Sequence, residues 1–174
     1  MDPNIQAAVH AVAAELETGV DVNQRQTRYY YKAGYNDRLR NDLHVQHLHL
    51  GPRDHEPDVT KRHLMAGGSS DLLWIVATPD DVYLIEILDH EGFGAFDFPQ
   101  VIHDNWKHLL GDPIPGWTVD EEDVLSAEER ATARRAGANT AVAINGQMFI
   151  PGGIMADGTS SRVLTASDRI LKGV

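Results

Sequence analysis

The chain has 174 residues, of which 42% are hydrophobic and 24% are charged, as expected for a folded globular protein. It contains no cysteine, which excludes disulfides, thiolate nucleophiles, zinc fingers and iron–sulfur sites; any metal would need histidine and carboxylate ligands. Its 15 basic and 26 acidic residues give a net charge of −11, which opposes non-specific attraction to a nucleic-acid backbone.

Length and apolar content predict one domain over residues 1–174. No apolar run approaches the roughly 20 residues that a membrane helix needs, and Met1 to Glu17 lacks the features of a secretory signal. We therefore expect a cytoplasmic protein with no membrane contact. Basic residues gather in the first 62 positions, where Arg25 belongs to one of several clusters that could form a basic patch.

The N-terminal third is predicted to contain one helix and two strands. Asp2 before Pro3 is typical of a helix start, and apolar residues at spacings of four and three continue the helix to about Gly19. Strands are expected over 27–32 and 43–50, with a turn or short helical piece at 35–41 between them. Residues 51–70 have two prolines, three glycines and no periodicity, which predicts a long mobile loop.

Two continuous apolar runs, Leu72 to Ala77 and Val82 to Leu88, flank the turn sequence TPDD and predict an antiparallel hairpin with both faces largely buried. Asp97 is expected to cap a helix over 98–110, in which Ile102, Trp106 and Leu109 face inward.

Ser126 and Glu129 have capping-box spacing and predict a surface helix over 127–136. Asn145-Gly146 predicts a type I′ hairpin between strands at 140–144 and 147–150. The glycine-rich segment 151–158 partly matches the sequence motif of a phosphate-binding loop but lacks the lysine of that motif. A helix is expected after it, over 160–172. The fold class that follows is α+β: a mostly antiparallel sheet flanked by about four helices.

The candidate chemistry lies in the sequence LHVQHLHL at 43–50. Side chains alternate along a strand, so His47 and His49 share one face, about 7 Å apart, while His44 lies on the other. A third group must come from elsewhere. His90 directly follows the second apolar run, and Glu86 has the same phase and is the only ionisable residue within that run.

Each of these histidines also has a structural interpretation, because a histidine on a half-buried strand often only completes the packing. For His47 and His49 the two interpretations are evenly balanced. His10, His103 and His108 lie on the polar sides of predicted helices and are interpreted as surface residues.

Roughly residues 39–90 combine a histidine-bearing strand, a loop with basic residues, and the hairpin LLWIVATPDDVYLIEIL followed by a histidine. This combination resembles the sheet of the RelE and YoeB-like bacterial toxin ribonucleases. The resemblance implies metal-independent RNA cleavage by a general acid and base. His90 would correspond to the histidine after the last strand, and Arg62 or Lys61 would supply the cation. The chain is longer and more acidic than that family, and Asp89 and Glu91 flank His90 where an aromatic residue is usual.

Three functions therefore stay open. The first is a toxin-like endoribonuclease without cofactor, in which His47, His49 and His90 exchange protons, with Arg62 and Glu86 assisting, and whose partners are RNA or an antitoxin. The second is a site for a divalent metal such as zinc, ligated by His47, His49 and a third residue such as His90, Glu86 or an aspartate, and supporting hydrolysis or structure. The third is a non-enzymatic, acidic interaction or immunity-like protein.

Overall fold

The computed structural model describes residues 2–26, 38–51, 71–90, 96–136 and 141–150. The described parts of Met1–Asp37 and Gln46–Phe93 form one compact unit, and those of Arg38–Val45 and Gly94–Val174 form another. Helices and two antiparallel sheets make the class α+β, as predicted. The described residues form two small sheets, of three and two strands, and not the predicted arrangement of one mostly antiparallel sheet flanked by about four helices. The strand expected at 27–32, the loop at 51–70, the glycine-rich segment 151–158 and the helix at 160–172 lie outside the described residues.

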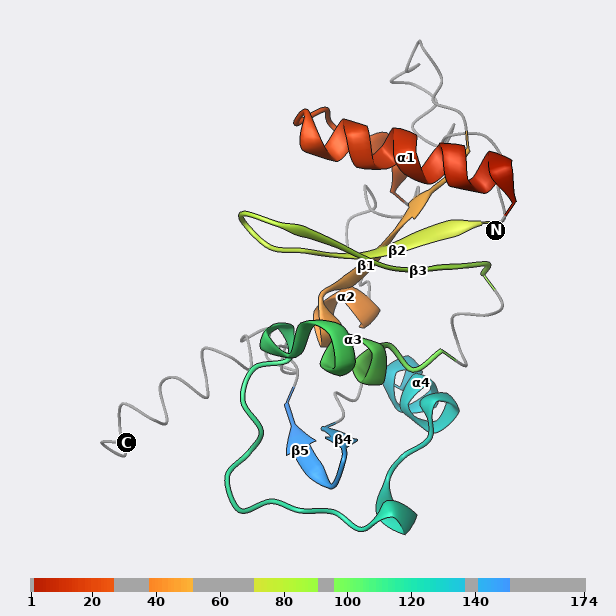
Figure 1. Cartoon of the computed structure of the whole chain (residues 1–174). Coiled ribbons are helices and arrows are strands. Elements are labelled where there is room, and N and C mark those ends of the chain that lie inside the picture. The colour runs from red at the N-terminus through yellow and green to blue at the C-terminus, as the bar shows by residue number, and fades with distance from the viewer. Residues whose placement is uncertain (1, 27–37, 52–70, 91–95, 137–140, 151–174) are drawn as a thin grey trace. The chain divides into compact units, whose positions relative to one another are not determined.

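The first unit is a three-stranded sheet with one helix on it (Figure 1). Helix α1 spans Pro3–Glu17 and begins as predicted, with the Asp2 carboxylate accepting a hydrogen bond from the Asn4 amide at 2.7 Å. Strands β1 (Val45–His49), β2 (Leu72–Ala77) and β3 (Val82–Leu88) lie in the order β1-β2-β3.

The core of this unit lies between α1 and one face of the sheet. Val12 of α1 is fully buried against apolar side chains of β1 and β2, and α1 adds partly buried residues around them. The fully or nearly fully buried members from the sheet side are Leu48, Leu50, Leu73 and Ile75. Burial of such side chains stabilises the unit by about 2 kcal/mol each.

The hairpin β2–β3 has the predicted bounds, and Thr78 and Asp81 close its turn through a backbone hydrogen bond of 2.8 Å. The expectation that both faces are largely buried is wrong for β3. Val82 and Leu84 are exposed, because β3 is an edge strand of the sheet, whereas β2 lies between two neighbours and is buried along most of its length.

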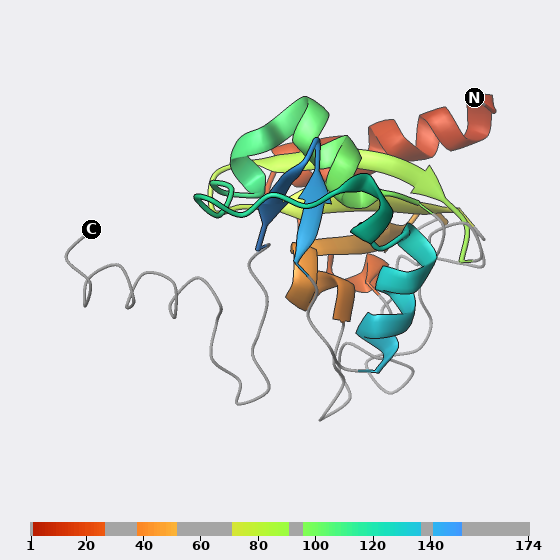
Figure 2. The same cartoon turned by 90° about the horizontal axis from the view of Figure 1, so that it is seen from below.

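The second unit contains α2 (Arg38–Leu43), α3 (Phe98–Trp106), α4 (Ala127–Arg135) and the hairpin of β4 (Val142–Ile144) and β5 (Gln147–Phe149). Helix α3 is capped by Asp97 and packs against the hairpin (Figure 2). It ends earlier than predicted, and a 3₁₀ turn, Lys107–Leu109, continues the chain to Gly111, whose φ is +78°. The predicted type I′ turn is confirmed by positive φ at Asn145 and Gly146.

The expectation that α4 is a surface helix is wrong on one side. Arg130 and Ala131 are buried, and the Arg130 guanidinium lies 2.7 Å from the Asp97 carboxylate at the start of α3. The aliphatic part of an arginine can be buried when its charged end is paired, which a count of polar residues does not reveal.

The capping box of α4 is confirmed, since the Ser126 hydroxyl accepts from the Glu129 amide and the Glu129 carboxylate accepts from the Ser126 amide. Ser126→Ala is expected to lower the free energy of unfolding by about 1 kcal/mol, because it leaves one helix amide without its cap. Urea denaturation measures this loss, and Ser126→Thr, which keeps the hydroxyl, is the matched control. Equal stability of the alanine variant and the wild type would contradict a stabilising cap.

Among the described residues, no helix combines the length and the apolar character that crossing a bilayer requires.

Candidate functional site

The histidines of β1 occupy the face of the sheet opposite α1. Leu48 and Leu50 are buried under α1, so alternation along the strand presents His47 and His49 on the other face, as predicted. His44 is not part of the strand. It has a φ of +58° and its amide donates to the Arg40 carbonyl at 2.8 Å, which ends α2 in a left-handed cap.

The order and direction of the strands bring His90 to the same end of the sheet as His49. The Leu50 amide donates to the Asp71 carbonyl at 3.4 Å, which places the end of β1 beside the start of β2. Leu72 in turn pairs with Leu88 at the end of β3. The chain therefore leaves β1 and β3 at one end of the sheet, and His90 lies two residues beyond β3.

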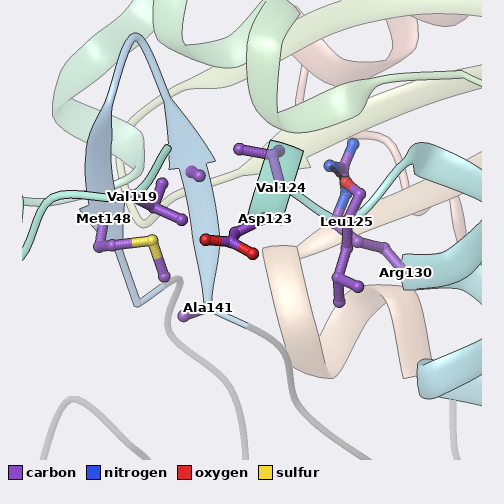
Figure 3. A pocket seen from close by; sticks show the side chains of 8 residues that line it. Val119, Asp123, Val124, Leu125, Arg130, Ala141 and Met148 are labelled. Carbon is purple, nitrogen blue, oxygen red and sulfur yellow. Dashed lines mark hydrogen bonds between the residues drawn. The ribbon is translucent and has the colours of Figure 1, made fainter. Parts of the chain in front are cut away.

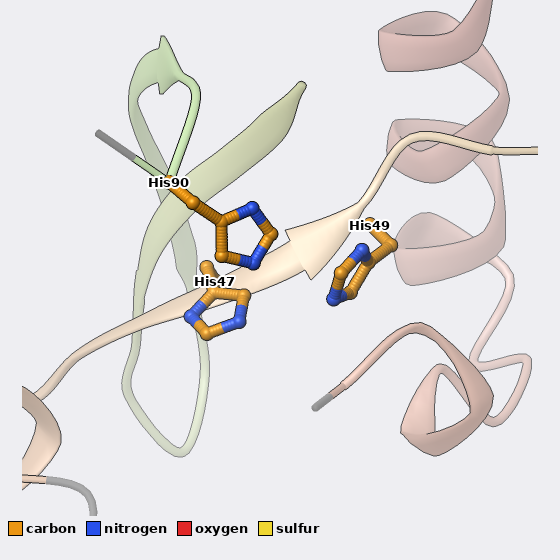
Figure 4. A group of neighbouring side chains, drawn as sticks. All are labelled: His47, His49 and His90. Atoms are coloured by element: carbon orange, nitrogen blue, oxygen red, sulfur yellow. The ribbon is translucent and has the colours of Figure 1, made fainter. Parts of the chain in front are cut away.

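The three imidazoles form a compact cluster, named here the histidine cluster: His47, His49 and His90 (Figure 4). One ring nitrogen from each residue can be chosen so that all three lie within 4.8 Å of one another. The ring centroids are 5.6 Å apart for His47 and His49, 5.7 Å for His49 and His90, and 6.1 Å for His47 and His90. His47 and His49 are half-buried, whereas His90 is exposed, so solvent reaches one side of the cluster.

The ring of His47 also contacts β2, with its centroid 4.9 Å from that of Trp74. Burial, and to a smaller extent the neighbouring His49 and His90, lower the pKa of His47 to about 4. The His47 imidazole is therefore neutral at pH 7, and an unprotonated ring nitrogen is the form that binds a metal ion.

Glu86 does not join the histidine cluster. It is exposed, and its carboxylate accepts a hydrogen bond from the adjacent Ile87 amide at 2.9 Å. The expectation that this run is buried on both faces is wrong at Glu86, because its side chain on the edge strand β3 reaches water. Arg62 and Lys61, the predicted cations, lie outside the described residues.

Arg25 is a residue near the histidine cluster that the sequence interpretation placed wrongly, in a surface basic patch. It is only 4% exposed, and its guanidinium contacts the Glu15 carboxylate at 2.7 Å and the His49 carbonyl at 3.0 Å. No local pattern predicts this, since Glu15 and His49 are 10 and 24 residues away in the sequence.

The histidine cluster does not include His10, His103 or His108. His10 and His108 are exposed, as predicted. His103 is half-buried rather than a solvated surface residue, because its ring packs 5.7 Å from the ring of Phe149 and its Nδ1 lies 3.0 Å from the Asp104 carboxylate. It therefore has a structural role in the packing of α3 on the β4–β5 hairpin.

A cavity of about 290 Å³ lies in the second unit and is lined mainly by apolar side chains (Figure 3). Its charged lining residues are Asp123 and Arg130. The Arg130 guanidinium already contacts the Leu125 carbonyl and the Asp97 carboxylate. The histidine cluster, with three groups able to ligate or transfer protons, is therefore the better candidate for chemistry.

The chain was compared with models of protein families, with curated proteins and with solved structures, and none of the three comparisons finds a match.

Proposed function

We propose that this protein binds one divalent transition-metal ion, with zinc as the favoured ion, through His47, His49 and His90. The observation that supports this most directly is the meeting of three imidazole nitrogens within 4.8 Å. Two nitrogens bound to one tetrahedral zinc lie about 3.4 Å apart, because each Zn–N bond is about 2.0–2.1 Å long. Binding would therefore require side-chain rotations that bring the three nitrogens closer together.

The low proton affinity of His47 favours metal binding over proton transfer. Catalytic acids and bases work best when their pKa lies near the operating pH, and a base with a pKa of about 4 accepts a proton poorly at pH 7. Metal affinity, in contrast, is higher at such a ring, because no proton has to be displaced when the metal ion binds. The neutral His47 ring, with two further imidazoles beside it, therefore suits a metal ion better than it suits a proton.

The number of ligands indicates what kind of centre this is. Structural zinc sites have four protein ligands, whereas catalytic sites have three and leave one position for water or substrate. Within the described residues the group that could hold a metal consists of three histidines and no carboxylate, and its exposed member, His90, lies on the solvent side. We infer a centre with an open position, suited to hydrolysis by a water that the bound metal activates.

Zinc titration of the untagged wild-type protein, followed by desalting and elemental analysis, tests the proposal. We expect one zinc ion per chain, and a stabilisation of about 4 kcal/mol when free zinc is a thousand times its dissociation constant. The control is His10→Gln, which removes an exposed imidazole of α1 and should bind zinc like the wild type. Retention of less than a tenth of a zinc ion per chain, with no thermal stabilisation, would refute the metal centre.

The endoribonuclease stays a second proposal, because the same three imidazoles are close enough to contact one substrate. It differs in its response to chelation: RNA cleavage that continues in EDTA and is lost in His47, His49 and His90 variants would favour it. Cleavage that requires added zinc would favour the metal centre instead. The resemblance to the RelE and YoeB-like ribonucleases, and the interaction-protein alternative, stay predictions.

A further inference from the structure

Arg25 connects helix α1 to the end of the histidine-bearing strand. Its Nε and one terminal nitrogen donate to the two Glu15 carboxylate oxygens at 2.7 and 2.8 Å. Its other terminal nitrogen donates to the carbonyls of His49 and Gly51 at 3.0 and 3.1 Å. Four of the five guanidinium N–H donors are thus accounted for by these bonds.

Both ends of this connection are held firmly. Glu15 belongs to α1, whose Val12 is fully buried in the core of the unit. Arg25 ends a short 3₁₀ helix, Asn23–Arg25, in which its amide donates to the Val22 carbonyl at 2.9 Å, and Val22 packs against the same core. The guanidinium therefore has a defined position relative to the sheet.

A contribution to stability alone does not account for this arrangement. Buried ion pairs often contribute little net stability, because removing two charges from water offsets most of their attraction. What the pair does supply is geometry, since the planar guanidinium fixes the directions of several acceptors at once. The acceptors here are the backbone of His49 and the backbone two residues beyond it.

We propose that Arg25 is a positioning residue for the metal centre: by holding the His49 carbonyl, it sets the place from which the His49 ring approaches the ion. The inference rests on the proposed function. His49 is the last residue of β1, where a strand normally begins to fray, so the orientation of its side chain depends on how its backbone is anchored. Groups that orient metal ligands typically change metal affinity 10–100-fold when they are removed.

Arg25→Lys is the test variant, because lysine keeps the charge but its single ammonium cannot hold both carboxylate oxygens and both carbonyls. We expect the zinc dissociation constant to rise about tenfold relative to the wild type. Cobalt(II) substituted for zinc should show an altered visible spectrum in the variant, which reports a change in the geometry of the centre. Glu15→Gln, which removes the carboxylate anchor, should shift both measurements in the same direction by a smaller amount.

Val12→Ala is the matched control, since it destabilises the same unit by removing buried methyl groups and leaves the Arg25 contacts in place. It should lower the melting temperature with an unchanged zinc dissociation constant and cobalt spectrum. Equal zinc affinity and equal spectra in Arg25→Lys and the wild type would overturn the positioning role while leaving the metal centre standing.

Imidazole NMR signals of the metal-free protein keep the inference testable if zinc does not bind. In Arg25→Lys the His49 ring signals should shift and broaden, whereas those of His10 should not. Unchanged His49 signals would refute the positioning role independently of the metal.

Discussion

Replacing His47 by glutamine is expected to weaken zinc binding by about a hundredfold or more. Apparent binding free energies of structural zinc sites are about 10–16 kcal/mol, so each of their few ligands contributes roughly 3 kcal/mol. A loss of that size raises the dissociation constant about a hundredfold. His47 is suited to the proposed role of ligand, because its lowered pKa keeps it unprotonated at pH 7 and its ring lies against that of Trp74.

Competition with a chromophoric chelator measures the affinity of this variant, with His10→Gln as the control for the loss of an exposed imidazole. His49→Gln and His90→Gln should show losses of similar size, because all three residues supply one ligand atom each. A zinc affinity within threefold of the wild type in His47→Gln would rule out His47 as a ligand and with it the three-histidine centre.

The metal-free protein should lose stability as the pH falls from about 6.5 to about 4. The pKa of His47 is about 4 in the folded chain and 6.5 in the unfolded chain, so within this window only the unfolded state takes up a proton at His47. The stabilisation is fully present above pH 6.5 and is lost by pH 4. Its upper limit lies between about 3 and 4 kcal/mol, since one pKa unit corresponds to about 1.4 kcal/mol.

Urea unfolding in EDTA at a series of pH values measures this loss. The profile of His47→Gln should be flatter than that of the wild type between pH 6.5 and pH 4, because glutamine does not titrate. His10→Gln should follow the wild type, since His10 is exposed on α1. Parallel profiles for the wild type and His47→Gln would show that burial does not lower the pKa of His47.

Local patterns predicted those parts of the fold that depend on neighbours in the sequence. The helix start at Asp2, the capping box at Ser126 and the turn at Asn145-Gly146 are all present, because each depends on hydrogen bonds or dihedral angles within about four residues. The pairing of His47 with His49 on one face follows from strand periodicity in the same way.

The errors at Glu86, Arg25 and His103 share one physical cause. The burial of a side chain depends on which strand forms the edge of a sheet and on which helix covers the sheet. A local sequence pattern predicts neither of these. Glu86 is exposed because β3 is an edge strand, while Arg25 is buried because Glu15 and two backbone carbonyls satisfy its donors.

By itself the sequence determined that His47 and His49 share one face of a strand and that His90 follows another strand, because alternation and turn chemistry are local. Only the tertiary structure decided that the three rings meet. In the strand order β1-β2-β3, the two outer strands are about 10 Å apart and both end at the same end of the sheet. His90, just beyond β3, reaches across this distance to the histidines of β1. Burial and the neighbouring imidazoles then lower the pKa of His47, which supports the proposal that the histidine cluster binds a cation.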